Sequence, residues 1–230
     1  PRRTDPETGV TYKSTLKPVG QAYTTKTYDT DKDKVHEVSL EPANDEEILN
    51  TIKVMGGEDW ERWMDFLREA DVLAEGCKTT AYTYIGKELT WPIYGQATIG
   101  KAKEDLDRAA AAIIGKNSDL LVQANVSSLK ALVTQASSAI PVMPLYISLI
   151  YKVMKEEGTH EGCIEQIHGL FTQCLFGNTP TLDEANRYRM DGKETNDATQ
   201  AKIKALWDQV TQENFHDLSD YKGYNHEFLK

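Results

Sequence analysis

Apolar and polar positions alternate with two different periods along this chain of 230 residues. From Asn44 to Ala70 apolar side chains recur every three to four positions, as in amphipathic helices, and Gly56-Gly57 interrupts the pattern. We predict a first helix capped by Asn44 or Asp45 and ending at the glycine pair, and a second over Trp60–Ala70. The buried stripe of the second helix is predicted to comprise Trp60, Trp63, Met64 and Leu67.

Other segments favour strands. Residues 1–43 are polar with alternating apolar positions, which predicts short strands and a hairpin turn at Pro18 to Gly20. Thr79–Ile85 is dense in threonine, tyrosine and isoleucine and is predicted as a strand. The alanine-rich stretch that ends at Gly115 predicts a helix beginning near Ile99 or Gly100. A buried strand is expected over Asn125–Thr134.

The last third of the chain is mainly helical in pattern. Helices are predicted over residues 143–157, 161–176 and 198–214, with a loop-rich stretch at 177–198 and an aromatic covering segment at 215–230. We expect an α/β fold, and in open sheets of this class ligands lie beyond the carboxyl ends of the strands. We divide the chain into a strand and loop segment (residues 1–43), a helical segment (44–76), a segment with the candidate chemistry (77–176) and a helical cover (177–230).

The charge and cysteine content of the chain limit the classes of function that it can have. The net charge of −10 leaves no basic stripe for phosphates, so nucleic acid is not an expected partner. Three cysteines without a C-x-x-C pair suit a reducing cytoplasm. The apolar run Ala139–Met154 contains two prolines and is too short for a bilayer, so we predict a buried helix and no membrane insertion. His160, Cys163 and His168 do not complete a ligand set, and no metal is predicted.

The candidate chemistry lies between the predicted strand at Thr79–Ile85 and the helix that follows it. Tyr84 and Tyr94 precede two lysines, Lys101 and Lys103. An ammonium near a phenol favours the phenolate, and such a pair can stabilise an oxyanion that develops on a carbonyl. An unbroken helix from Tyr94 would favour Lys101, whereas a loop at Tyr94 leaves either lysine possible. The glycines and β-branched residues between them favour the loop.

The spacing of Tyr94, eight residues and Lys103 resembles the Tyr-x8-Lys signature of the FabV-type trans-2-enoyl thioester reductases. These enzymes are NADH-dependent and related to the short-chain dehydrogenase/reductase superfamily. Further segments resemble the same family: Val54–Trp63, Leu132–Tyr146, Lys152–Gln166 and Gly223–Lys230. The resemblance therefore covers nearly the whole chain.

The resemblance implies NADH as cofactor and an enoyl thioester of acyl carrier protein or coenzyme A as substrate. It implies that Tyr94 donates a hydrogen bond to the thioester oxygen, that Lys103 holds the nicotinamide ribose, and that Tyr84 is the second tyrosine over the substrate carbonyl. Cofactor contacts are expected at Lys103 and at the end of the predicted strand, from residues Leu132, Val133, Thr134 and Gln135. The intact enzyme is expected to be a cytoplasmic monomer.

No G-x-G-x-x-G loop follows a strand in this chain, although the family begins with a βαβ unit carrying one. We therefore expect the C-terminal portion of a Rossmann-like reductase domain that lacks its first βαβ unit, inactive by itself. The alternatives are a noncatalytic helical interaction module and a ketone- or alcohol-type short-chain dehydrogenase. The latter group uses Tyr-x3-Lys, and that spacing after Tyr94 falls on Thr98.

Overall fold

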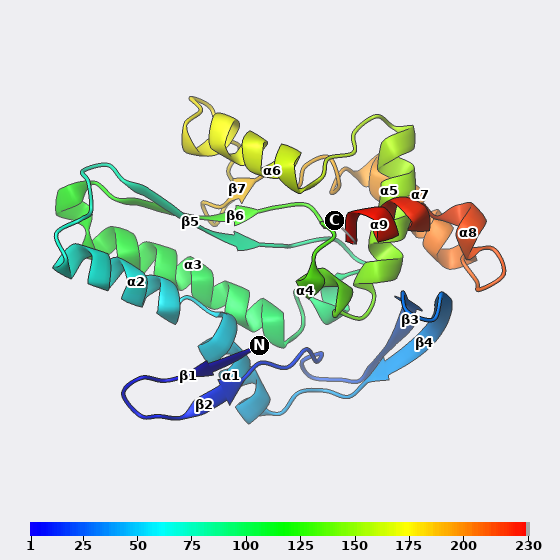
Figure 1. The fold of residues 1–230 in the computed structure, drawn as a ribbon, viewed down its shortest axis with the longest axis horizontal. Helices are drawn as coiled ribbons and strands as arrows, with labels where there is room; N and C mark the ends of the chain where they lie inside the picture. Colours follow the sequence, from blue (N-terminus) through cyan, green and yellow to red (C-terminus); the bar gives the residue numbers. More distant parts are fainter. Residues whose placement is uncertain (229–230) are drawn as a thin grey trace.

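A parallel sheet of three strands lies at the centre of the computed structural model, which describes residues 1–228 (Figure 1). The strand order is β5-β6-β7, and both neighbouring pairs are parallel. Their bounds are Lys78–Thr83 for β5, Gln123–Ser128 for β6 and Tyr188–Arg189 for β7. This confirms an α/β fold with a parallel sheet.

Helices cover both faces of this sheet (Figure 1). On one face α2 (Glu58–Glu69) and α3 (Thr98–Lys116) pack against β6 through Met64, Leu106, Ile113 and Val126. On the other face α6 (Cys163–Gly169) continues into a π-helical turn, Leu170–Leu175, which packs against β7. The α4 turn (Gln135–Ser138) follows β6.

The largest core surrounds α5, Met143–Glu156, which lies beyond the sheet. Eleven of its residues are buried, including Tyr146 and Tyr151, so the predicted buried helix is confirmed. In residues 1–228 no helix combines the length and apolar character needed to cross a bilayer. Three C-terminal helices also contribute to this core: α7 (Asp197–Gln209), α8 (Phe215–Leu218) and α9 (Tyr221–Phe228).

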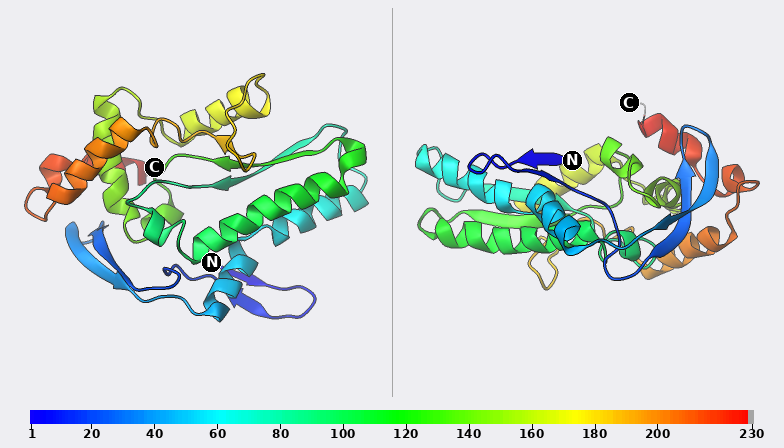
Figure 2. Two further views of the ribbon diagram at one scale, coloured as in Figure 1. Left: turned by 180° about the vertical axis from the view of Figure 1, so that it is seen from behind. Right: turned by 90° about the horizontal axis from the view of Figure 1, so that it is seen from below.

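Two antiparallel hairpins and α1 complete the fold (Figure 2). The hairpin of β1 (Arg2–Thr4) and β2 (Thr11–Lys13) packs on α1 (Asp45–Met55), whereas that of β3 (Tyr23–Asp29) and β4 (Lys34–Leu40) packs on α5. Asn44 caps α1 as predicted, in a capping box with Glu47.

Several predictions from the pattern are wrong. Pro18 does not turn a hairpin, because it forms a bridge to Ala97 and both hairpins turn elsewhere. Trp63 is 66% exposed, since only one side of α2 faces α3. The helix predicted to reach Asn214 ends at Gln209, because Val210 is extended. The loop-rich prediction for residues 177–198 missed the short strand β7.

The strand expected over Asn125–Thr134 is also too long, because β6 ends at Ser128. The Leu129 amide still donates to the Thr83 carbonyl. The next backbone amides donate to side chains instead, that of Lys130 to Gln166 and that of Ala131 to Glu194. A strand pairs only where its backbone groups meet a neighbouring backbone.

Candidate active site

Tyr94 lies in a loop immediately before α3, as the glycines around it predict. A 3₁₀ turn over Trp91–Ile93 precedes it, and the helix begins at Thr98. The loop packs closely on the helix at Gly100, where an added Cβ would lie 2.1 Å from the Gly95 carbonyl oxygen. Glycine at this position therefore permits the approach that brings Tyr94 beside the first turns of α3.

Tyr84, Tyr94 and Lys103 line one cavity of about 190 Å³, together with Trp91, Gly95 and Arg187. Tyr84 directly follows β5, Tyr94 comes from the loop and Lys103 from the second turn of α3. The structure thus brings together the three residues that the sequence singled out for chemistry.

The Tyr94 hydroxyl does not have the lowered pKa expected of a phenol near an ammonium group. Burial raises its pKa to about 12, and the lysine does not offset that effect. The phenol therefore stays protonated near neutral pH and can act as a hydrogen-bond donor. Within residues 1–228 its hydroxyl makes no hydrogen bond.

The two lysines of α3 have different surroundings. Lys103 lines the cavity, and its Nζ donates to the Tyr82 carbonyl at 3.3 Å. Burial lowers the pKa of Lys103. Lys101 instead forms an ion pair with Glu104 at 2.9 Å, one turn along the exposed side of the helix. Residues two positions apart point about 200° apart on a helix, so only one of them can reach the cavity.

Tyr84 is held through both its ring and its hydroxyl group. The ring meets that of Tyr94 edge to face, with centroids 4.9 Å apart and planes at 86°. Its hydroxyl donates to Glu194 Oε1 at 2.8 Å and lies 3.3 Å from Thr90 Oγ1. Sequence reasoning missed Glu194, because it lies 110 residues away in the stretch predicted as loop. No periodic pattern or local motif marks it.

The predicted cofactor residues after β6 do not line this cavity. Thr134 caps α4, with its Oγ1 accepting from the Ser137 amide at 3.0 Å, and Gln135 is exposed. Val133 lines a different cavity, and Leu132 precedes it along the chain. Of the expected cofactor residues, only Lys103 therefore lies with the tyrosines.

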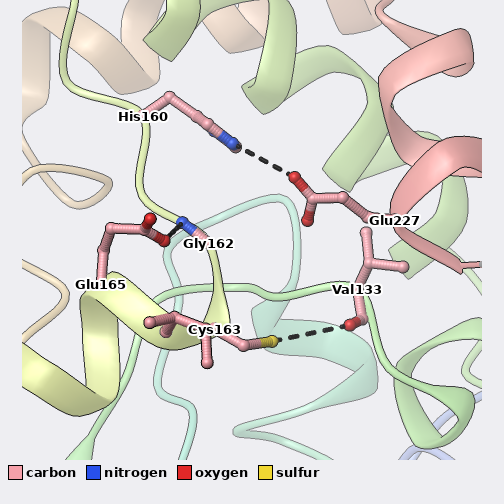
Figure 3. A pocket seen from close by; sticks show the side chains of 7 residues that line it. Val133, His160, Gly162, Cys163, Glu165 and Glu227 are labelled. Carbon is pink, nitrogen blue, oxygen red and sulfur yellow. Dashed lines mark hydrogen bonds and ion pairs between the residues drawn. The ribbon is translucent and has the colours of Figure 1, made fainter. Parts of the chain in front are cut away.

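The second cavity has a volume of about 540 Å³ and lies between α6, α9 and the segment after β6 (Figure 3). His160 Nε2 lies 3.5 Å from Glu227, and the Cys163 thiol donates to the Val133 carbonyl at 3.8 Å. Burial lowers the pKa of His160 and raises the pKa of Cys163. A raised pKa makes the thiol harder to ionise and therefore a weaker nucleophile. The described part of the chain holds no group of three side chains suited to a metal ion.

A family model described as trans-2-enoyl-CoA reductase catalytic region matches residues 1–176. The chain belongs to the trans-2-enoyl-CoA reductase family. Among solved structures, the trans-2-enoyl-CoA reductase of Clostridium acetobutulicum in complex with NADH superposes with a TM-score of 0.96 at 42% identity. That of Treponema denticola in complex with NAD gives a TM-score of 0.93 at 50% identity. Both cover all of this chain, which corresponds to 58% and 57% of those chains.

Curated members of the trans-2-enoyl-CoA reductase family are similar over the same region. An NADH enoyl-acyl-carrier-protein reductase of Pseudoalteromonas atlantica is 83% identical over all 230 residues. One of Idiomarina loihiensis is 72% identical over 229 residues. The chain spans 58% of the length of each of these relatives.

A second family model, described as enoyl reductase FAD binding domain, matches residues 182–230. In the described part of this segment the large aromatic side chains Trp207, Phe215 and Tyr224 are buried in the core around α5. These three rings pack the interior and are not available to stack on an isoalloxazine ring. We therefore assign them no flavin contact.

Proposed function

We propose that this chain carries the tyrosine–lysine part of the active site of an NADH-dependent reductase. The substrate is a trans-2-enoyl thioester of acyl carrier protein or coenzyme A, and its double bond is reduced in the cytoplasm. The observation that supports this best is the cavity shared by Tyr94 and Lys103, nine residues apart in the chain. The parallel sheet would be the C-terminal part of a Rossmann-like sheet.

When bound, NADH supplies the hydride that is added to the β-carbon of the enoyl group. Negative charge then develops on the thioester oxygen, which becomes an enolate oxygen, and the α-carbon takes up a proton from solvent to give the saturated thioester. Tyr94 would donate a hydrogen bond to that oxygen, since its phenol is protonated and makes no hydrogen bond within residues 1–228. A preorganised donor of this kind contributes roughly 10²–10³ in rate.

Lys103 would bind the ribose hydroxyls of the nicotinamide half. An ammonium group has three donors, and the structure occupies one of them with the Tyr82 carbonyl. The remaining donors fit a pair of hydroxyl groups. Tyr84 has its own hydroxyl bound to Glu194, so its part would be to hold the Tyr94 ring in place through the edge-to-face contact.

A chimera tests this function. Residues 1–230 replace the matching region of the 83% identical Pseudoalteromonas atlantica reductase. With crotonyl-CoA or crotonyl-acyl carrier protein, the chimera should oxidise NADH and yield the saturated thioester. Oxidation is followed by NADH absorbance and the product by mass spectrometry. A chimera that is folded by circular dichroism but reduces neither thioester contradicts the proposed function.

A further inference from the structure

Glu194 is a carboxylic acid in the interior of the protein, in the turn between β7 and α7, with none of its surface exposed. A buried carboxyl group is costly unless hydrogen bonds satisfy both oxygens. Here Oε1 accepts from the hydroxyls of Tyr84 and Tyr146, each at 2.8 Å. Oε2 accepts from the backbone amide of Ala131 at 2.6 Å.

These three contacts join segments that are far apart in the sequence. Tyr84 follows β5, Tyr146 lies on α5, and Ala131 lies in the segment after β6. Through Tyr84 the carboxyl group is one side chain away from the Tyr94 ring. Through Ala131 it holds the backbone directly before Leu132. Glu194 therefore contacts Tyr84, whose ring packs on Tyr94, and the segment expected beside the nicotinamide.

The surroundings hold this carboxyl group in a single position. Gln200 donates from Nε2 to the Tyr146 hydroxyl at 3.0 Å and to the Glu194 backbone carbonyl at 2.8 Å. Lys130 is also buried, and its Nζ donates to the Ala131 carbonyl at 2.8 Å. A buried polar group whose partners are all satisfied confines the segments that it joins.

We propose that Glu194 is a positioning residue that fixes Tyr84, and through it Tyr94, relative to the segment after β6. Its Oε1 arm orients Tyr84 and thereby Tyr94, and its Oε2 arm fixes the backbone at Ala131. The inference rests on the proposed function and adds to it a residue that touches neither substrate nor cofactor.

The test uses Glu194→Gln in the chimera, with Asp191→Asn as a matched control. Glutamine keeps the volume, but its amide nitrogen cannot accept a hydrogen bond. Turned toward Ala131 it meets an N–H donor, and turned toward the tyrosines it requires their hydroxyls to accept instead of donate. Asp191 is an equally buried acid three residues away, bonded to Ser128 and Arg189 instead of to the tyrosines. Both variants lose a buried carboxylate and should melt at a lower temperature.

Only Glu194→Gln should change the kinetics of the folded enzyme. We expect kcat to fall about 10- to 100-fold, the scale of a small misplacement of a reacting group. Because Glu194 Oε2 holds the backbone at Ala131, the KM for NADH of Glu194→Gln should rise at least threefold. Asp191→Asn should keep both kcat and the KM for NADH within about twofold of the parent chimera. The effects of Glu194→Gln and Tyr84→Phe on kcat should be less than additive.

Other outcomes separate the two proposals. Unchanged kinetics in Glu194→Gln, or equal losses in both acid variants, overturn the positioning role while the active parent chimera still supports the reductase. Fully additive effects of Glu194→Gln and Tyr84→Phe also overturn it. An inactive parent chimera counts against the reductase function, on which the positioning role depends.

Discussion

Tyr84 and Tyr94 line the same cavity but differ in their hydrogen bonds, and we therefore propose different roles for them in the reaction. The Tyr84 hydroxyl is bound to Glu194, whereas the Tyr94 hydroxyl makes no hydrogen bond within residues 1–228. We expect Tyr94→Phe to lower kcat of the chimera by about two to three orders of magnitude, because only the donor is lost. NADH affinity, measured by cofactor fluorescence, should stay nearly unchanged. Near-normal turnover would remove Tyr94 from the mechanism.

Lys103 should set the alkaline limit of turnover. Burial lowers its pKa from 10.5 and raises the pKa of Tyr94 to about 12, so the lysine loses its proton first as the pH rises. Activity should therefore fall on the alkaline side while Tyr94 is still protonated. Arginine keeps its charge to higher pH, so Lys103→Arg should move the alkaline limb of the kcat profile to higher pH. If the alkaline limb does not move, a group other than Lys103 sets it.

The two lysines of α3 provide a matched pair of substitutions. Methionine keeps much of the side-chain stem and deletes the ammonium. Lys103→Met should raise the KM for NADH and lower kcat, because the cavity loses the ammonium group proposed to bind the ribose. Lys101→Met removes only an exposed pair with Glu104 and should change either constant by less than about threefold. A reversed asymmetry in steady-state kinetics would assign the cofactor contact to Lys101.

Among the structural elements, α3 positions the site through a glycine that permits close packing. Gly100→Ala would place a Cβ 2.1 Å from the Gly95 carbonyl oxygen and push the Tyr94 loop away. We expect a loss of about 1–3 kcal/mol of unfolding free energy, as for overpacking, and about tenfold lower turnover. The Gly95 and Gly100 backbones could instead separate without moving Tyr94. In that case stability falls and turnover does not.

Gly115, in the last turn of the same helix, is the control for Gly100→Ala. An added Cβ there meets nothing within 4 Å. Gly115→Ala should therefore stabilise the protein by about 0.5 kcal/mol through helix propensity and leave turnover unchanged. Urea unfolding of both variants measures the contrast.

Elements with a strong local signal could be predicted from the sequence. The α3 start, the Asn44 cap and the buried α5 follow from composition, side-chain spacing and the position of glycine or proline. β7 could not be predicted, because a strand of two residues pairs only by meeting β6. The family resemblance in the Tyr94–Lys103 spacing predicted that these two side chains act together, and both line the same cavity. Glu194 could not be predicted, since it reaches Tyr84 only through the tertiary fold.

At the scale of the whole molecule, the proposed function gives the described residues the side chains that contact the thioester and the nicotinamide end of the cofactor. A dinucleotide also carries a pyrophosphate, which is commonly bound by the backbone amides of a glycine-rich loop at a helix start. The sequence contains no G-x-G-x-x-G loop after a strand. Its net charge of −10 adds no general attraction for phosphates. NADH affinity should therefore depend on residues outside this chain.

This dependence can be measured by titrating NADH, with cofactor fluorescence as the signal, into the 230-residue chain and into the chimera. The chain alone has Lys103 for the ribose and no loop for the pyrophosphate, so its Kd should be at least about 100-fold weaker, equivalent to roughly 3 kcal/mol. Lys103→Met should weaken NADH binding to the chimera and to the chain alone, because both use the same ribose contact. A micromolar Kd for the chain alone would mean that residues 1–230 contain a phosphate site of a different kind.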